Sequence, residues 1–422
     1  MIIGKLVSLS SPRLVATLAA LYFVLIAAAG VPVTALPGST WVALKPLPNQ
    51  GSSAVFALAV DPSNDQVVIA GNSQGTLLRS ADGGSTWSSV HTGRPGLTAI
   101  AFSPYSGGLV IAGTRGGGAI ASSDDGATWK AVSGLDGRTV HAFGFSLTVM
   151  AAGTDRGVYL SQDGFAWTQS GLSAHNIGAL AVAAIHTPVK LIAGSDASAS
   201  GGSVPLFVSA DAGVTWSLLT PAISGTVIVK LAAGPLPPKG TVRPLVAGTN
   251  AGLFQSADNG ATFTPLSGGD LLPTVDYTQV AFVTTHYNRY YVASDGGGSG
   301  LGGLWRTTDG GNTFATLAPP ASSISALAVS NEESPILYVA TFRPADHVAA
   351  LWAFRDTGGA PVGPVVTPTP VVSGARTSPS GGSGSGLLSA LRSSQAPYVG
   401  LGLAALIVIG LAVVANFRGS RR

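Results

Sequence analysis

Cysteine is absent from this sequence, and acidic and basic residues together make up only 10% of it. The missing cysteines exclude disulfides, thiolate nucleophiles and cysteine-ligated metal sites. Only two glutamates occur, Glu332 and Glu333, and they are adjacent in a segment that ends in Ser334-Pro335. Serine and proline favour turns, so this pair indicates a surface loop. The chain therefore offers few glutamates for catalysis.

A run of basic residues is also absent from the middle of the chain. The formal net charge is +3, and five basic residues flank the two apolar ends of the sequence: Lys5, Arg13, Arg418, Arg421 and Arg422. Their position is typical of membrane topology signals, whereas a nucleic-acid-binding domain carries its basic residues on the folded part. No nucleic-acid partner is expected.

Glycine and proline are abundant, with 57 and 27 residues, and 46% of the chain is hydrophobic. Both residues are poor helix formers. Many short strands joined by tight turns accommodate them well. The composition therefore predicts an all-β fold.

The N-terminal segment, 1–35, is predicted to be a signal peptide or an uncleaved N-terminal anchor. Lys5 and Arg13 precede an uncharged apolar run, and small residues follow at Val33-Thr34-Ala35. A basic start, an apolar middle and a small-residue end are the parts of a secretory signal. The domain that follows is expected to be exported.

The C-terminal segment, 397–417, is predicted to be a transmembrane helix, with a buried core helix as the alternative. Its uncharged residues would span about one hydrocarbon core as a helix. The short basic tail, 418–422, is then cytoplasmic by the positive-inside rule, and the body is extracytoplasmic. Residues 357–396 are rich in Gly, Pro, Ser and Thr, a composition that predicts a disordered stalk.

A repeated motif, Ser/Thr-x-Asp-x-Gly-x-Thr-Trp/Phe, organises residues 39–356. Six copies occur, one of them shortened, and their aspartates lie 39 to 51 residues apart. The recurring residues are Ser80, Asp82, Gly84, Trp87; Ser122, Asp124, Gly126, Trp129; Ser161, Asp163, Trp167; Ser209, Asp211, Gly213, Trp216; Ser256, Asp258, Gly260, Phe263; Thr307, Asp309, Gly311, Phe314. A period of this length is typical of propeller blades or solenoid repeats.

The motif resembles the Asp box, or BNR repeat, of sialidases, sortilin-type receptors, some glycoside hydrolases and Ycf48-like photosystem assembly factors. The resemblance implies a β-propeller of four-stranded antiparallel blades and says little about activity. In such a box the hydroxyl and carboxylate accept hydrogen bonds from the turn, glycine takes a positive φ, and the aromatic ring packs between blades. A ligand or metal role for the box aspartates is the alternative.

Seven blades are predicted, with six or eight as the alternatives. Three strands without a box follow the sixth copy, within 325–356, and a fourth strand with the matching Thr40-Trp41 occurs at the start of the domain. The N-terminal strand would then complete the last blade and close the ring, which removes an open sheet edge.

The candidate ligand-binding residues lie in loops that follow the second strand of a blade. They are Arg115, Arg156, Arg343, Asp155, Asp196 and Asp295. A ring could bring the three arginines to one mouth and create an anion-binding surface, and ordinary solvated loop arginines are the alternative. The histidines lack metal-ligand spacing, so no metal and no cofactor is expected.

The function predicted from these features is a membrane-anchored extracytoplasmic binding or scaffolding module for a protein or glycan partner, and not an enzyme. The arginine triad with its tyrosine–glutamate pair, which sialidases need, does not assemble from this sequence. A glycoside hydrolase on the same fold, sialidase-like or another glycosidase in which two aspartates could serve, is the first alternative. An assembly factor for a membrane complex, similar to the Ycf48 group, is the second.

Overall fold

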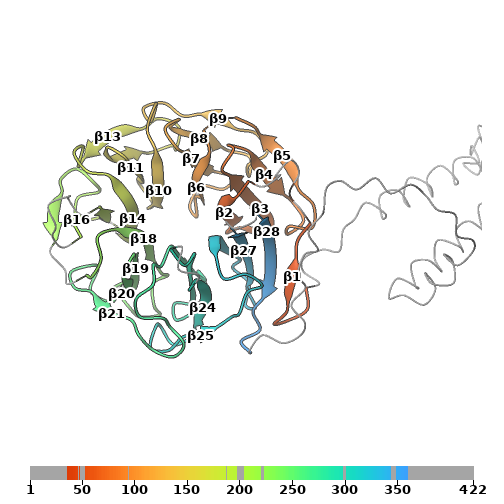
Figure 1. The fold of residues 1–422 in the computed structure, drawn as a ribbon. Coiled ribbons are helices and arrows are strands. Elements are labelled where there is room, and N and C mark those ends of the chain that lie inside the picture. Colours follow the sequence, from red (N-terminus) through yellow and green to blue (C-terminus); the bar gives the residue numbers. More distant parts are fainter. Residues whose placement is uncertain are drawn as a thin grey trace, which may run out of the picture. The chain divides into compact units, whose positions relative to one another are not determined.

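The computed structural model describes residues 36–45, 47, 53–93, 95–186, 188–196, 204–219, 223–297, 301–343 and 348–359. Within them the regular secondary structure is entirely β, and it forms seven four-stranded antiparallel sheets. The sheets surround a common centre (Figure 1). The fold is a seven-bladed β-propeller, as predicted, and the alternatives of six and eight blades are wrong.

The blades follow one another in chain order, and in each blade the first strand is innermost. Blade 1 consists of β2 (Val55–Asp61), β3 (Asn64–Asn72), β4 (Leu77–Ser80) and β5 (Ser88–His91), and blade 2 of β6 (Leu97–Phe102), β7 (Val110–Thr114), β8 (Ala119–Ser122) and β9 (Lys130–Ala131). Blade 3 consists of β10 (Val140–Phe145), β11 (Met150–Thr154), β12 (Gly157–Ser161) and β13 (Thr168–Gly171), and blade 4 of β14 (Ile177–Ala184), β15 (Lys190–Ser195), β16 (Leu206–Ser209) and β17 (Ser217–Leu219). Blade 5 consists of β18 (Ile228–Ala233), β19 (Leu245–Thr249), β20 (Gly252–Ser256) and β21 (Thr264–Pro265), and blade 6 of β22 (Gln279–Phe282), β23 (Tyr290–Ser294), β24 (Gly303–Thr307) and β25 (Ala315–Thr316). Blade 7 consists of β26 (Ile324–Val329), β27 (Ile336–Arg343), β28 (Val348–Arg355) and β1 (Trp41–Ala43).

The ring closes through β1, the N-terminal strand, which pairs antiparallel with β28 as the outer strand of blade 7. Trp41 is its anchor. Its ring lies 4.8 Å from that of Phe354, and its indole N–H donates to the carbonyl of Leu317 at 2.8 Å. The predicted closure of the last blade by the N-terminal strand is therefore present.

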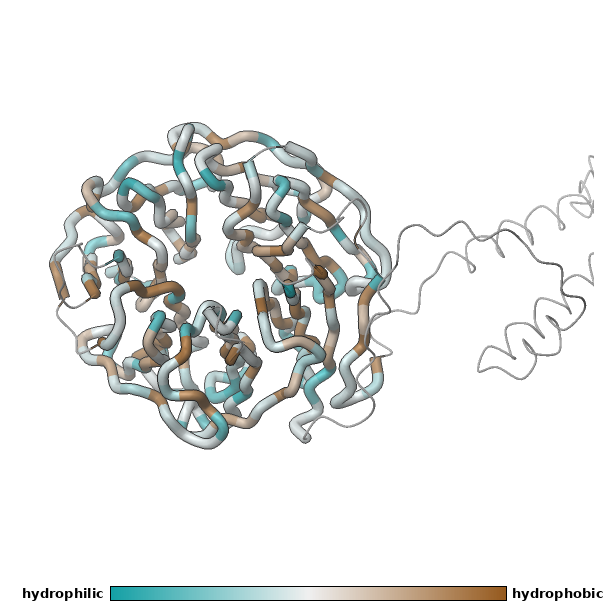
Figure 2. The backbone as a smooth tube through the Cα atoms, in the orientation of Figure 1, coloured by the Kyte–Doolittle hydropathy of each residue, from teal (hydrophilic) through white to brown (hydrophobic). Residues whose placement is uncertain are grey.

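The core is divided among the seven interfaces between neighbouring blades. Each buried cluster in the described residues draws its side chains from two adjacent blades. Four of the second strands, β7, β11, β19 and β23, are buried at every position. A strand covered on both faces carries an unbroken apolar run, which explains the repeated Val-Ile-Ala-Gly pattern. The hydrophobic residues accordingly gather in the strands of the blades (Figure 2).

Glycine in that pattern allows neighbouring blades to approach each other. A Cβ placed on Gly113 would lie 2.7 Å from the carbonyl oxygen of Val140 in the next blade, and one on Gly248 would lie 2.2 Å from that of Tyr277. Neither contact is tolerated between real atoms. The repeated glycine is therefore a packing requirement between blades.

The box motifs occupy equivalent hairpins between the third and fourth strands of blades 1 to 6. In the first box, Ser80 Oγ accepts from the N–H of Gly84 at 2.7 Å and donates to Asp82 at 2.8 Å. Asp82 in turn accepts from the N–H and hydroxyl of Thr86, at 2.8 and 2.6 Å. The Trp87 indole donates to the Gly84 carbonyl at 3.0 Å. The box carboxylates thus bind their own turns.

No helix in the described residues is long and apolar enough to cross a membrane. The predicted signal segment 1–35, the helix 397–417, the tail 418–422 and the stalk beyond residue 359 lie outside those residues. The anchoring of the propeller thus stays a prediction.

Candidate functional site

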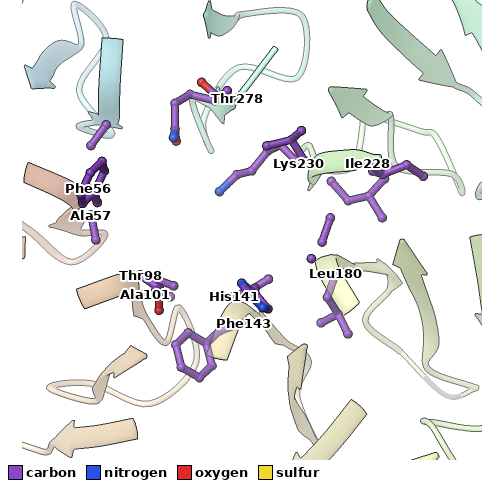
Figure 3. A pocket seen from close by; sticks show the side chains of 18 of the residues that line it. Phe56, Ala57, Thr98, Ala101, His141, Phe143, Leu180, Ile228, Lys230 and Thr278 are labelled. Carbon is purple, nitrogen blue, oxygen red and sulfur yellow. The ribbon is translucent and has the colours of Figure 1, made fainter. Parts of the chain in front are cut away.

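The first strands of all seven blades enclose a central channel with a volume of about 430 Å³ (Figure 3). One end of the ring carries the box hairpins. The other end carries the loops between the second and third strands and the loops between blades, and we call it the mouth face. All six predicted ligand-binding residues lie on or next to loops of the mouth face.

A β-bulge near the start of the first strand recurs in six blades. The register with the second strand skips one residue between Val55 and Ala57 and at the equivalent place in blades 2, 3, 4, 5 and 7. The skipped residues are Phe56, Thr98, His141, Gly178, Val229 and Ser325. A bulge redirects a side chain away from the sheet pattern, and most of these residues line the channel.

The residue after the bulge forms a second layer in the channel wall. It is alanine in five blades: Ala57, Ala99, Ala142, Ala179 and Ala326. In blades 5 and 6 the equivalent residues are Lys230 and Gln279. Figure 3 shows the Lys230 side chain extending into the open space of the channel. Small residues elsewhere in the layer leave that space unfilled.

His141 lies half-buried at the channel wall in blade 3 and is surrounded by polar groups of the mouth face. Burial lowers its pKa, and the carboxylates of Asp155 and Asp196 oppose that shift. Asp196 accepts a hydrogen bond from the Asn176 side-chain amide at 2.7 Å. Arg138 approaches Asp155 at 3.6 Å. With a lowered pKa the imidazole is mostly neutral at pH 7.

Three of the six predicted residues come together around this histidine. Arg115, Asp155 and Asp196, from blades 2, 3 and 4, all act electrostatically on His141. With Arg138, His141 and Asn176 they form what we call the mouth cluster, which comprises Arg115, Arg138, His141, Asp155, Asn176 and Asp196.

The other three predicted residues do not join the mouth cluster. Arg156 is exposed, and its carbonyl accepts from the Gln169 amide at 2.9 Å. Arg343 is exposed at the end of β27 in blade 7, and Asp295 is exposed in blade 6. Blades 6 and 7 lie across the ring from the cluster (Figure 1). Arg343 therefore lies in another part of the ring than Arg115 and Arg156, which belong to the neighbouring blades 2 and 3.

Asp295 instead has a carboxyl neighbour, Asp276. Burial raises the pKa of Asp276, and the adjacent Asp295 carboxyl raises it further. Ser294 donates a hydrogen bond to Asp276 at 3.0 Å, and the N–H of Gly297 donates to Asp295 at 2.9 Å. Within the described residues no group of three or more His, Asp or Glu side chains could hold a metal ion.

Sequence reasoning missed Lys230, Gln279, His141, Asn176 and Thr278. A usable signal exists, because aligning the first strands of the blades shows alanine at one position in all but two of them. A simple alternation of inward and outward residues does not reveal this position, because the bulge adds one residue to the strand and shifts the alternation. Its recurrence became visible only in the paired register.

No protein-family model and no curated protein matches the chain. Among solved structures, the chain is similar to a GH74 xyloglucanase from Xanthomonas campestris (TM-score 0.54, 16% identity, 74% of this chain and 55% of that chain). It is also similar to YCF48 bound to D1 peptide (TM-score 0.51, 17% identity, 78% and 99%) and to a chain of the mitotic checkpoint complex (TM-score 0.53, 12% identity, 84% and 99%). The chain spans about half the length of the xyloglucanase. These likenesses concern the propeller fold alone.

Proposed function

We propose that this chain is a membrane-anchored, extracytoplasmic binding module that takes a protein or glycan partner on its mouth face. The observation that carries the proposal is the mouth cluster, in which polar groups from three successive blades converge at the rim of the channel. Such a rim of charged and amide side chains supplies directional hydrogen bonds to a partner, and the rigid blades hold them in place.

The opposite end of the ring, which carries the box hairpins, is a weaker candidate for recognition. Its aspartates are engaged by their own turns, and three of them, Asp124, Asp211 and Asp258, have pKa values lowered to about 2, mainly by those hydrogen bonds. A carboxylate that already accepts several hydrogen bonds has little capacity left for a ligand. The mouth face retains exposed side chains such as Arg115 and Arg156.

Binding is favoured over glycoside hydrolysis by the arrangement of the acids. Two carboxyl pairs lie in hydrogen-bond contact among the described residues, Asp276 with Asp295 and Asp61 with Asp125. Glycosidases hold their two carboxyl groups roughly 5–10 Å apart, on either side of the scissile bond. A touching pair leaves no room for the sugar. A peptide is the first partner class to test, since YCF48, of similar fold, is named as bound to a peptide.

The test uses the full chain in detergent against a glycan array and a peptide array. Arg115→Ala is expected to weaken binding of any hit about tenfold, the effect of losing one charged hydrogen bond. Lys130→Ala removes the same charge from an exposed position on β9, an outer strand, and should leave binding unchanged. Equal effects of the two variants would place recognition away from the mouth cluster.

Two further measurements bear on the rest of the proposal. Release of reducing sugar from a polysaccharide by the purified chain would establish an enzyme and contradict the binding role. Protease treatment of intact cells should digest the propeller if it lies outside the cytoplasmic membrane. Complete protection of the propeller would overturn the proposed topology.

A further inference from the structure

The channel holds a charged group that the mouth cluster does not use. Lys230 lies on β18, half-buried in the channel wall. Within the described part of the chain its ammonium has no hydrogen bond and no ion pair. Burial alone lowers its pKa, and no carboxylate offsets that shift. The side chain reaches into the open channel without a counter-charge, so it can attract an anion there.

Two neighbouring groups on the adjacent blade are also without partners. Gln279 occupies the same layer as Lys230 in blade 6, and no described residue binds its side-chain amide. The preceding residue, Thr278, has a buried hydroxyl oxygen without a hydrogen-bond partner. Buried polar groups in folded proteins are nearly always paired. Thr278 is such an orphaned group, and the half-buried Lys230 and Gln279 beside it have donors available to a molecule in the channel.

The rest of the layer provides the space for such a molecule. The five alanines at the equivalent positions contribute no atoms beyond Cβ, and the channel is about 430 Å³ in volume. The channel is concave and its wall combines polar with apolar groups, a combination that suits a small ligand.

Charge balance selects the class of ligand. Lys230 is the one cationic side chain among the channel-lining residues described by the structure, since the lowered pKa of His141 leaves that ring mostly neutral. Asp196 adds a negative charge to the same wall. A monoanion would balance Lys230, whereas a phosphate dianion would find no second cation among the described lining residues.

We propose that the channel binds a carboxylate monoanion, with the Lys230 ammonium as its counter-charge and the Gln279 amide as a second donor. A carboxylate has two oxygens and can accept from both side chains at once. The ligand is a free organic acid or a carboxylate carried by a peptide, because the two present the same group. This site does not depend on the partner proposed for the mouth face.

Ligand-observed saturation-transfer NMR on the full chain in detergent tests the proposal at constant ionic strength. Acetate and glucuronate serve as free carboxylates, and acetyl-Gly-Glu-Gly-amide serves as the peptide-borne one. Acetamide and glucose are neutral counterparts, and inorganic phosphate, partly a dianion at neutral pH, is the more highly charged anion. At least one carboxylate should saturate the protein, and its neutral counterpart should bind at least about tenfold more weakly, as expected when a charged contact is lost.

Substitutions connect the binding to the channel. Lys230→Met should raise the dissociation constant about tenfold or more, and Gln279→Leu should raise it by about threefold, as expected for a charged and a neutral hydrogen bond. Lys130→Met removes an exposed lysine and should change nothing. If Lys230→Met fails to fold, Lys230→Gln replaces it. If only the peptide binds, the natural carboxylate belongs to a partner chain. If the free acids bind, it belongs to a small molecule.

Several results would overturn the proposal. It fails if no carboxylate probe binds, or if Lys230→Met and Lys130→Met bind equally well. It also fails if acetamide competes equally with acetate, or if phosphate binds more tightly than every carboxylate.

Discussion

A buried ion pair joins blade 6 to the end of blade 7, and removing its acid should destabilise the propeller strongly. Asp356 directly follows β28 and is fully buried. Its carboxylate accepts from Arg306 at 2.6 Å, from the Tyr291 hydroxyl at 2.5 Å and from the N–H of Gly358 at 2.9 Å. Arg306 and Tyr291 belong to blade 6, so Asp356 joins blade 6 to the end of the last blade.

The size of the effect follows from what Asp356→Asn leaves behind. The variant keeps the shape of the side chain and leaves the Arg306 guanidinium, whose side chain is 9% exposed, without its counter-charge. Breaking a buried pair by removing one partner costs about 3–5 kcal/mol. Folded proteins are stable by roughly 5–15 kcal/mol. The variant should therefore lose a large share of the free energy of unfolding.

Urea denaturation of the full chain in detergent, followed by tryptophan fluorescence, measures this loss. The matched control is Glu332→Gln, which breaks the Arg355–Glu332 pair, whose side chains are 15% and 27% exposed. Pairs nearer to solvent contribute about 0–1 kcal/mol. The reasoning is refuted if Asp356→Asn costs no more than Glu332→Gln.

Three further predictions concern the box motifs and the channel. Hydrogen bonds from nearby hydroxyls lower the pKa of Asp124 to about 2. The ionised carboxylate therefore stabilises the fold above the unfolded pKa of about 4, and this stabilisation is lost as the pH falls towards 2. In Asp124→Asn the urea midpoint should change less with pH over that range. Gly126→Ala should lower the free energy of unfolding by about 1–3 kcal/mol more than Gly116→Ala does. Both glycines have φ near +80°, but only a Cβ at position 126 would lie 2.3 Å from Ile69. Equal urea midpoints of the two variants would contradict this. Burial lowers the pKa of Lys230, so Lys230→Met should stabilise the ligand-free chain at pH 7. The gain in stability should shrink as the pH rises towards the unfolded lysine pKa of about 10.4. Thermal unfolding at pH 7 and above pH 10 tests whether the variant is the more stable form only at the lower pH.

The blade architecture could be predicted because its signals are local and repeated. Each box binds its own turn through side chains no more than four residues apart, as Ser80, Asp82 and Thr86 do. Spacing between copies then gives the length of one blade. The match between Thr40-Trp41 and the box ending gave the closure of the ring, which the pairing of β1 with β28 confirmed.

The candidate site was predicted only in part, for a geometric reason. Loop residues could be assigned to the mouth face from their position after the second strand. Their grouping could not be predicted, because blades 3 and 7 lie on different sides of the ring. Asp155 and Asp196 thus converge with Arg115 on His141, while Arg343 belongs to another sector.

By itself, the sequence determined the fold class, the number of blades and the way the ring closes, because short-range hydrogen bonds and hydrophobic periodicity specify each blade locally. It also predicts the membrane segments, which lie outside the described residues. Only the tertiary structure decided which polar groups share one environment. The recurring bulge turns side chains into the channel, and burial there leaves Lys230 without a counter-charge. Both effects depend on seven blades meeting around one axis, which no local stretch of sequence records.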